Sequence, residues 1–263
     1  MTRLIIKVLT LIGLITFYSC DSKENKVVTE VKPMYDLDSA LLDLDFVMGR
    51  FDPTSREDFV EIDIEFADRA NQWLYQDTYE AFKKMTAKAK EDSIHLVIRS
   101  ATRNFSAQKN IWERKWSGTT RLSDGTFASD IEDLKERALK ILLYSSMPGT
   151  SRHHWGTDID FNSFNNEYFE NGEGLKIYQW LQQNAADFGF FQPYTSKSSG
   201  RTGYEEEKWH WSYRPLSDIL TEYCFRNVTN EQIDGFDGAS TAIDINIVEN
   251  YILGISEWSD PAE

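Results

Sequence analysis

The sequence is poor in residues that cross-link chains. Its 263 residues include two cysteines, Cys20 at the end of an apolar leader and Cys224 deep in the chain. If Cys20 is modified, Cys224 has no partner, so no disulfide framework holds this fold. We interpret Cys224 as a small buried hydrophobe on a helix, which is the ordinary place of a free cysteine.

Basic residues are also scarce. There are 28 Lys and Arg residues against 43 Asp and Glu residues, and the formal net charge is -15. Because phosphate binding needs a basic face, this balance argues against nucleic acid as a partner. It also argues against adhesion to a membrane through a polybasic patch.

Long apolar runs are missing except near the start of the chain. There, Arg3 and Lys7 are followed by an apolar run over residues 8–17, which ends before Cys20. The run is short for a membrane span and has the layout of a secretory leader. A cysteine directly after a small residue resembles a bacterial lipoprotein signal. We predict that lipidated Cys20 anchors the protein in the bacterial cell envelope, outside the cytoplasm. An ordinary cleaved leader and a short anchor are the alternatives.

The rest of the chain lacks internal repeats and any linker rich in Pro or Gly. Its 41% hydrophobic content is that of one globular domain of ordinary size. We therefore predict a signal peptide at 1–19, a tether at 20–40, the main domain at 41–227 and a C-terminal extension at 228–263.

Hydrophobic periodicity predicts several helices and short strands within the domain. Apolar residues at three- and four-residue spacing indicate helices, whereas alternation indicates strands. The segment 59–66 alternates weakly and is either a strand or an extended arm. We predict helices at 39–51, 68–92, 130–144, 174–188 and 216–225, another helix through Ile111 and Trp112, and strands at 94–99, 157–161 and 209–213.

The segment 151–160 carries the residue types of a metal site. Two of the four histidines stand next to each other, followed by Gly156 and by Asp158 and Asp160 at alternate positions. Imidazole and carboxylate are ligands that zinc takes in catalytic sites, usually three of them plus a water. Because Gly156 suits a tight reversal, a loop and a strand together can bring His153 and Asp160 to one ion.

The third ligand must come from elsewhere, and only His95 and His210 remain. His95, on a predicted strand, fits a structural or exposed histidine better. Glu207 precedes His210 by three residues, and a zinc hydrolase needs such a carboxylate as general base beside its metal-bound water. Residues at this spacing share a face on a helix and not on a strand, so Glu207 must lie in a turn. The adjacent Glu205 and Glu206 leave the choice of base open. The simpler alternative needs no metal. In it, His153 and His154 are a pair of loop histidines and His210 is a core histidine.

Together these motifs resemble a known family. The pattern Ser151-x-His153-x-x-Gly156-x-x-x-Asp160, followed later by Glu207-x-Trp209-His210, is similar to the zinc D-alanyl-D-alanine carboxypeptidases, which include the vancomycin-resistance D,D-carboxypeptidases. The segment Ser100-Ala101-Thr102-Arg103, with Gln108 shortly after it, resembles their Ser-Gly-Tyr-Arg-Ser segment but departs from it at the second and third positions. The resemblance covers about residues 66–226.

The resemblance implies an α+β fold, in which a small antiparallel sheet carries a zinc site and helices pack around it. It implies that His153, Asp160 and His210 are the ligands of Zn²⁺. It further implies that Glu207 is the catalytic base. Arg103 would help to bind the substrate or to stabilise the oxyanion.

The resemblance also implies a substrate. Ser151 would contact the terminal carboxylate of a peptide, and Gln108 joins Arg103 and Ser151 as a predicted substrate-binding residue. The implied partner is a peptidoglycan stem peptide that ends in D-alanine and is hydrolysed at the bond to that residue. A location outside the cytoplasm suits such a target.

Three alternatives stay open. The same site could serve an L,D-carboxypeptidase or a peptidoglycan endopeptidase, and we expect the loop 195–203 to decide between these specificities. A zinc-containing binding module without catalysis, as in hedgehog-type relatives, is a second alternative, and the presence of Glu207 favours the enzyme over it. A lipid-anchored structural protein that holds glycan with its aromatic side chains is the third and needs no metal.

Overall fold

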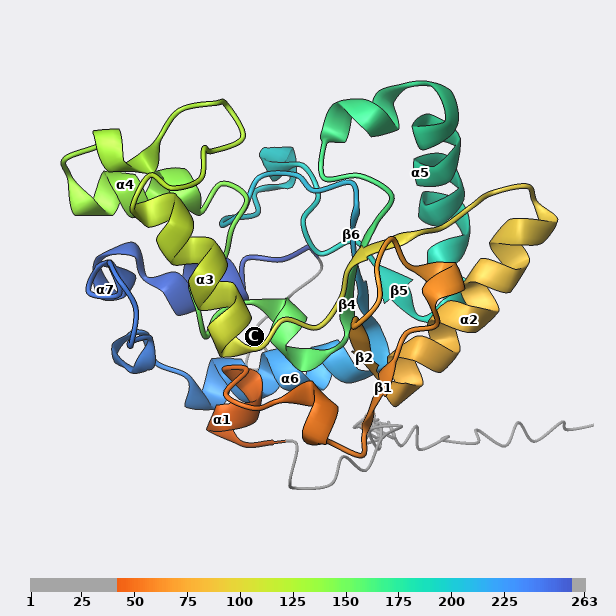
Figure 1. Cartoon of the computed structure of the whole chain (residues 1–263), viewed down its shortest axis with the longest axis horizontal. Helices are drawn as coiled ribbons and strands as arrows, with labels where there is room; N and C mark the ends of the chain where they lie inside the picture. Colours follow the sequence, from red (N-terminus) through yellow and green to blue (C-terminus); the bar gives the residue numbers. More distant parts are fainter. Residues whose placement is uncertain (1–41, 257–263) are drawn as a thin grey trace, which may run out of the picture. The chain divides into compact units, whose positions relative to one another are not determined.

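Four short antiparallel strands, far apart in the sequence, form the central sheet. The computed structural model describes residues 42–256, and the strand order in this sheet is β3-β4-β6-β5 (Figure 1). With helices packed around this sheet, the α+β class predicted above is confirmed. The strands are β3 (Ile98–Ser100), β4 (Asp158–Phe161), β6 (His210–Tyr213) and β5 (Phe190–Phe191).

The central pair, β4 and β6, is buried along its whole length. Ile159 on β4 packs into a hydrophobic core, whereas Asp158 and Asp160 face the opposite side, as strand alternation predicts. The register pairs Asp160 with His210 and Asp158 with Ser212. The polar residues of both strands are therefore neighbours across one ladder.

A two-stranded ribbon replaces part of a predicted helix. β1 (Phe59–Glu61) pairs with β2 (Trp73–Tyr75), so the prediction of one helix over 68–92 is wrong at its start. The backbone explains the difference. The N–H of Thr102 donates to the carbonyl of Trp73 at 3.0 Å, and the N–H of Tyr75 donates to the carbonyl of Gly156 at 3.1 Å. These tertiary hydrogen bonds override a helical pattern that propensity alone supports.

The helices differ from the predicted ones mainly at their ends. The first helix is much shorter than the predicted 39–51, and the predicted strand at 94–99 begins only at Ile98. Within the described part of the chain the α-helices are α1 (Leu44–Val47), α2 (Gln76–Glu91), α3 (Phe105–Trp116), α4 (Leu134–Ile141), α5 (Gly172–Asn184), α6 (Arg214–Asn227) and α7 (Thr241–Ile245).

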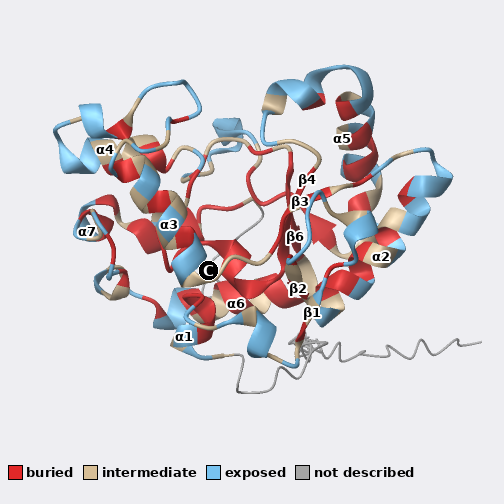
Figure 2. Cartoon of the chain, viewed as in Figure 1, coloured by how far each residue is buried: buried red, intermediate tan, exposed pale blue. Residues whose placement is uncertain are grey.

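Two hydrophobic clusters hold these elements. Figure 2 shows the buried residues on the central strands and on the inner sides of the helices. The first packs α2 and α5 against one face of the central sheet through residues such as Phe82, Phe161 and Leu181. The second packs α3, α4 and α6 together, and it includes Trp112 and Leu220. Residues 228–256, predicted to be an extension, contribute their apolar side chains to this second cluster. These are Val228, Ile233, Phe236, Ala242, Ile245, Ile247, Val248, Tyr251, Ile252 and Ile255.

The single cysteine of the described residues, Cys224 on α6, is buried as predicted, with 1% of its surface exposed. Between residues 42 and 256, no helix combines the length and apolar character that crossing a bilayer requires. The predicted signal peptide, the tether and Cys20 lie outside the described residues.

Candidate metal centre

Three predicted ligands converge at the edge where the central strands meet a short turn. Asp160 on β4, His210 on β6 and His153 in the turn Arg152–Trp155 are buried, and one ligand atom from each lies within 4.8 Å of the others. The strand register sets Asp160 beside His210. The third residue, His153, is held by the backbone of Arg103, because the Arg103 N–H donates to the His153 carbonyl at 3.1 Å. His95 is exposed and takes no part in this group.

The ring of His153 presents a free lone pair to the centre. Its Nδ1 is 2.8 Å from the carbonyl oxygen of Ala101, which can only accept, so Nδ1 carries the proton. Burial, with the nearby charge of Arg103, lowers the pKa of His153 and keeps the ring neutral. Its Nε2 then has no hydrogen-bond partner, although it lies 3.1 Å from Oδ2 of Asp160. Two acceptors this close repel each other unless a cation joins them.

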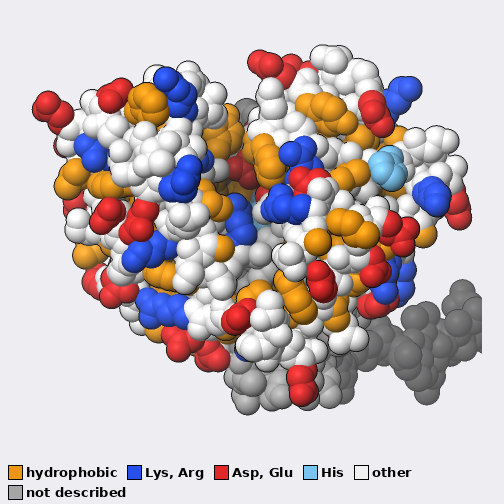
Figure 3. Space-filling view, in the orientation of Figure 1, with side chains coloured by type: hydrophobic (Ala, Val, Ile, Leu, Met, Phe, Trp, Pro, Cys, Tyr) orange, Lys and Arg blue, Asp and Glu red, His pale blue; other side chains and the backbone are white. Residues whose placement is uncertain are grey.

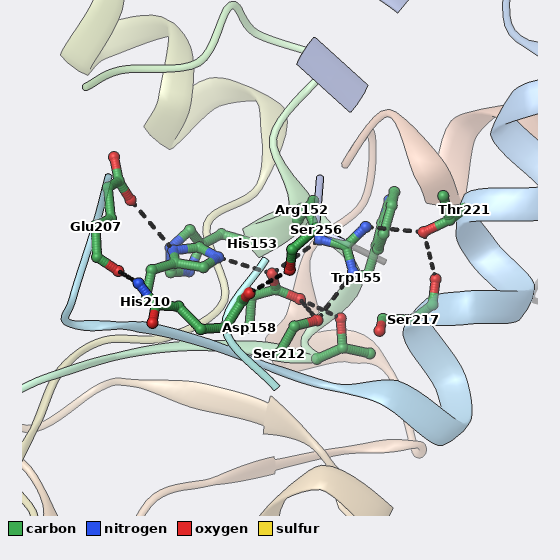
Figure 4. A network of polar contacts seen from close by, with 12 residues as sticks. Arg152, His153, Trp155, Asp158, Glu207, His210, Ser212, Ser217, Thr221 and Ser256 are labelled. Carbon is green, nitrogen blue, oxygen red and sulfur yellow. Dashed lines mark hydrogen bonds and ion pairs between the residues drawn. The ribbon is translucent and has the colours of Figure 1, made fainter. Parts of the chain in front are cut away.

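His210 has the opposite ring orientation. Its Nε2 is 2.8 Å from Oδ2 of Asp158 (Figure 4), while its Nδ1 is 2.9 Å from Oδ1 of Asp160. Burial alone would lower the pKa of His210, but hydrogen bonds to these two carboxylates raise it to about 9. The centre therefore attracts positive charge. Two imidazole nitrogens and one carboxylate oxygen form a donor set that zinc takes in catalytic sites, so these residues fit the ion.

Glu207 lies in the turn before β6, where the spacing argument requires it. Its backbone N–H donates to the carbonyl of Tyr194 at 2.9 Å, and its Oε2 is 3.6 Å from Nδ1 of His210. Burial, reinforced by Asp160 and opposed by His210, raises the pKa of Glu207 to about 8. Glu205 instead pairs with Lys197 at 2.8 Å. Of the three adjacent glutamates, Glu207 alone lines the cavity at the centre.

A cavity of about 900 Å³ opens over this centre. Figure 3 shows a hollow in this face with Lys and Arg side chains beside it. Arg103 lines the cavity, and its Nε is buried without a hydrogen-bond partner. The hydroxyl of Ser151 also lines it and also lacks a partner. Gln108 lies outside this lining, because its Nε2 donates to the carbonyl of Ser146 at 2.8 Å.

Sequence reasoning missed two groups of residues. Lys115 on α3 lines the cavity and donates to the hydroxyl of Ser145, and no signal in the sequence singled it out. Arg152 and Asp158 lie buried behind the ligands. The alternation of Asp158 with Asp160 was a usable signal, since it places both carboxylates on one side of β4. The neighbour His154 is structural, as its Nε2 accepts from the N–H of Gly149 at 3.0 Å.

The family model of the D-alanyl-D-alanine carboxypeptidases matches residues 71–216, more than half of the 263 residues. The fold is that of an α+β domain with a buried candidate metal centre, and the chain belongs to the D-alanyl-D-alanine carboxypeptidase family. The family predicted from the two motifs is thereby confirmed.

Similar proteins include the D-alanyl-D-alanine carboxypeptidase of Enterococcus faecalis, which is 26% identical over 125 residues, 48% of this chain and 42% of that one. The chain spans about half the length of the curated relatives it matches first, 42% of one and 55% of another. The structure of the LD-carboxypeptidase LdcB is 23% identical, with a TM-score of 0.49, over 68% of this chain and 81% of that one. A mutant of the vancomycin-resistance D,D-pentapeptidase VanY in complex with Zn(II) is 20% identical, with a TM-score of 0.45, over 62% of this chain and 88% of that one.

Proposed function

We propose that this protein is a zinc-dependent carboxypeptidase that hydrolyses the bond to a terminal D-alanine in peptidoglycan stem peptides. The observation that carries the proposal is the convergence of His153, Asp160 and His210 at the floor of a cavity, with the carboxylate of Glu207 beside them. His153 and His210 would hold the ion through Nε2 and Nδ1, and Asp160 through its carboxylate. A bound zinc ion supplies a Lewis acid for the scissile carbonyl and promotes the ionisation of water.

Glu207 moves the proton in this scheme. A general base first takes a proton from water and then returns it to the leaving amine, so its pKa should lie near the working pH. Burial raises the pKa of Glu207 to about 8, which suits both steps. Its position next to His210 Nδ1 also brings it to the water-accessible side of the centre.

The lining of the cavity also provides positive charge. Arg103 and Lys115 both line it, and neither forms an ion pair with any residue between 42 and 256. We assign the guanidinium of Arg103 to the carbonyl oxygen as it gains negative charge. Lys115 and the unpaired hydroxyl of Ser151 would receive the terminal carboxylate of the peptide. Lys115, which has no ion pair among residues 42–256, favours a carboxypeptidase, because the residue that such an enzyme releases carries a free carboxylate.

The test is metal analysis of the purified domain together with D-alanine release from a stem pentapeptide, by wild type and by Glu207→Gln. We expect bound zinc in both proteins and turnover only in the wild type. Equal turnover in the two would remove Glu207 from the mechanism, and full activity of zinc-free protein would remove the whole scheme. Zinc binding without release of any amino acid would favour the binding module.

Parallel substrates separate the specificities. A pentapeptide that ends in D-alanyl-D-alanine tests the D,D-carboxypeptidase, and the tetrapeptide that ends in a single D-alanine after an L-centre tests the L,D-carboxypeptidase. A cross-linked dimer without a free carboxylate at the cleaved bond tests the endopeptidase. We expect turnover of the pentapeptide, and preferred cleavage of either other substrate would reassign the activity.

We also propose that Cys20 is lipidated and anchors the domain in the cell envelope. The proposal rests on the basic start of the leader, its apolar run and the serine before the cysteine. Expression of the full chain with Cys20→Ser tests it. We expect loss of the protein from the membrane fraction, and an unchanged membrane fraction would contradict lipidation.

A further inference from the structure

Behind the ligands lies a charged group that does not reach the cavity. The guanidinium of Arg152 is fully buried, and its Nε is 3.1 Å from Oδ2 of Asp158. It also lies over the ring of Trp155, 4.6 Å from the ring centre (Figure 4). Neither Arg152 nor Asp158 lines the cavity. Burying a charged pair costs free energy, so a buried pair is weak evidence for stability. The position of Arg152 and Asp158 therefore needs another explanation.

Each hydroxyl around Arg152 accepts one hydrogen bond and donates another, so the direction of each bond is defined. Its Nη1 donates to Thr221 at 2.8 Å, and Thr221 in turn donates to the carbonyl of Ser217 at 2.6 Å. Its Nη2 donates to Ser212 at 2.9 Å, and the hydroxyl of Ser212 donates to Oδ1 of Asp158 at 2.7 Å. The hydrogen bonds therefore run outward from Arg152 in two branches, one through Thr221 to the backbone of α6 and one through Ser212 to Asp158 on β4.

Asp158 is the end of the second branch. Its Oδ1 accepts from the hydroxyls of Thr157 and Ser212, both at 2.7 Å. Its Oδ2 accepts from Arg152 and lies 2.8 Å from Nε2 of His210. Because Arg152 and the two hydroxyls all donate to this carboxylate, the atom it offers to His210 is an acceptor. The ring of His210 must therefore turn its Nε2–H to Asp158 and its Nδ1 to Asp160.

We propose that Arg152 and Asp158 are positioning residues, which fix the ring orientation of His210 so that Nδ1 is the atom offered to the metal ion. The pair also ties together the three elements that carry the candidate ligands. Arg152 adjoins His153 in the turn, Asp158 stands two residues before Asp160 on β4, and the two contact Ser212 and His210 on β6. A carboxylate that receives the second N–H of a ligating histidine tunes metal affinity in this way. This inference depends on the proposed function in one respect, namely that the metal ion is zinc.

The experiment measures zinc affinity without substrate. Wild type, Asp158→Asn and Asp158→Ala are titrated with zinc against a chromophoric chelator, and near-ultraviolet circular dichroism checks that each is folded. We expect zinc to bind about 10- to 100-fold more weakly to both variants. The matched control is Leu181→Ala, a core truncation on α5 far from the ligands in sequence, which should lower Tm and leave zinc affinity unchanged.

A double variant separates positioning from simple stability. In Arg152→Met with Asp158→Asn both charges are gone, so no buried charge is left unpaired and Tm should recover relative to Asp158→Asn alone. Zinc affinity should stay low, because the ionised acceptor for His210 is still missing. Recovery of both properties together would show that the pair is only structural and would overturn the proposal.

A spectroscopic readout follows the hydrogen bond itself. With four histidines in the chain, the ring N–H signals of the zinc-loaded, ¹⁵N-histidine-labelled protein can be assigned by substitution. We expect a slowly exchanging Nε2–H for His210 in the wild type and its loss in Asp158→Ala.

If both Asp158 variants fail to fold, Thr221→Val is the substitute. It removes the hydroxyl that accepts from the guanidinium of Arg152, and it should still weaken zinc binding severalfold. Wild-type zinc affinity in a folded Asp158 or Thr221 variant overturns the inference, whether or not the enzyme releases D-alanine. Zinc binding without D-alanine release would instead contradict the proposed function alone, and a wild type without zinc would contradict both.

Discussion

Asp160 and His210 face each other across the central strand pair, with Oδ1 of the first 2.9 Å from Nδ1 of the second. This pairing comes from the register of β4 and β6, so two of the three predicted ligands are placed by backbone hydrogen bonds. The third, His153, is held by the carbonyl of Ala101 next to β3. Three strands of one small sheet therefore determine the geometry of the centre.

Asp160→Asn should abolish tight zinc binding while the fold is kept. The amide has nearly the shape of the carboxylate but supplies no negative charge, and zinc ligands of this type are ionised. We expect zinc to be lost on dialysis against a chelator that leaves the wild type loaded. Zinc content by mass spectrometry measures the outcome, and Asp187→Asn, at an exposed position in the turn after α5, is a matched control that should stay loaded. Retention of one zinc by Asp160→Asn would exclude this carboxylate as a ligand.

Lys115→Met should raise KM and leave kcat nearly unchanged. The lysine is partly buried without a carboxylate partner among residues 42–256, and burial lowers its pKa further than the opposing charge of Glu207 raises it. A substrate carboxylate would provide the missing counter-charge, and a hydrogen bond to a charged group is worth about 1.5–3 kcal/mol. We expect KM for the pentapeptide to rise by about 10- to 100-fold.

The control for Lys115 lies on the same helix. Lys109 bonds to the carbonyl of Gly235 and does not line the cavity, so Lys109→Met should leave KM unchanged. Steady-state kinetics with peptides that end in a free carboxylate or in an amide measure the effect. If Lys115→Met loses the same factor on both peptides, the lysine does not bind the terminal carboxylate.

The candidate ligand group could be predicted because histidine is rare in this chain, so few combinations with carboxylates were available. The base could not be chosen among Glu205, Glu206 and Glu207 from spacing alone. The turn before β6, held by the hydrogen bond from Glu207 to Tyr194, brings Glu207 to the cavity and not Glu205 or Glu206, which is why we propose Glu207 as the base. Strand β2 was missed because its backbone pairs with residues far away in the sequence, which no local pattern reveals.

The place of Lys115 in the cavity could not be predicted from the sequence, for a similar reason. On α3 it stands among charged residues that a helical pattern assigns to solvent, and its burial results from contact with the segment around Ser145. Asp158 could have been recognised as a neighbour of Asp160. Its partners Arg152 and Ser212 could not, since they come from a turn and another strand.

Gly156→Ala should destabilise the protein strongly and weaken zinc binding. Gly156 has φ of +71°, and an added Cβ would lie 2.5 Å from a ring carbon of Phe59 and 2.8 Å from the backbone nitrogen of Tyr75. Left-handed backbone alone costs about 1–2 kcal/mol for an alanine, and the clash adds to it. Gly125→Ala is the matched control, because Gly125 has φ of +82° and nothing within 4 Å. Denaturant unfolding should show a clearly larger loss of free energy for Gly156→Ala, and equal losses would mean that the reversal before β4 has room to adjust.

Cys224 should be unreactive in the native protein. Burial raises the pKa of its thiol to about 12, although the charge of Arg152 opposes the shift, and the thiolate is the reactive form. The unfolded chain loses this proton near the ordinary pKa of 9.0, whereas the folded chain keeps it to about 12. The resulting stabilisation is complete below pH 9 and declines as the pH rises through 12. At pH 8 a Cys20→Ser protein should therefore be alkylated by iodoacetamide only after unfolding, as intact mass measures. Rapid modification of the folded protein would contradict the burial of this thiol, and the same reagent applied in denaturant confirms that the residue is competent to react.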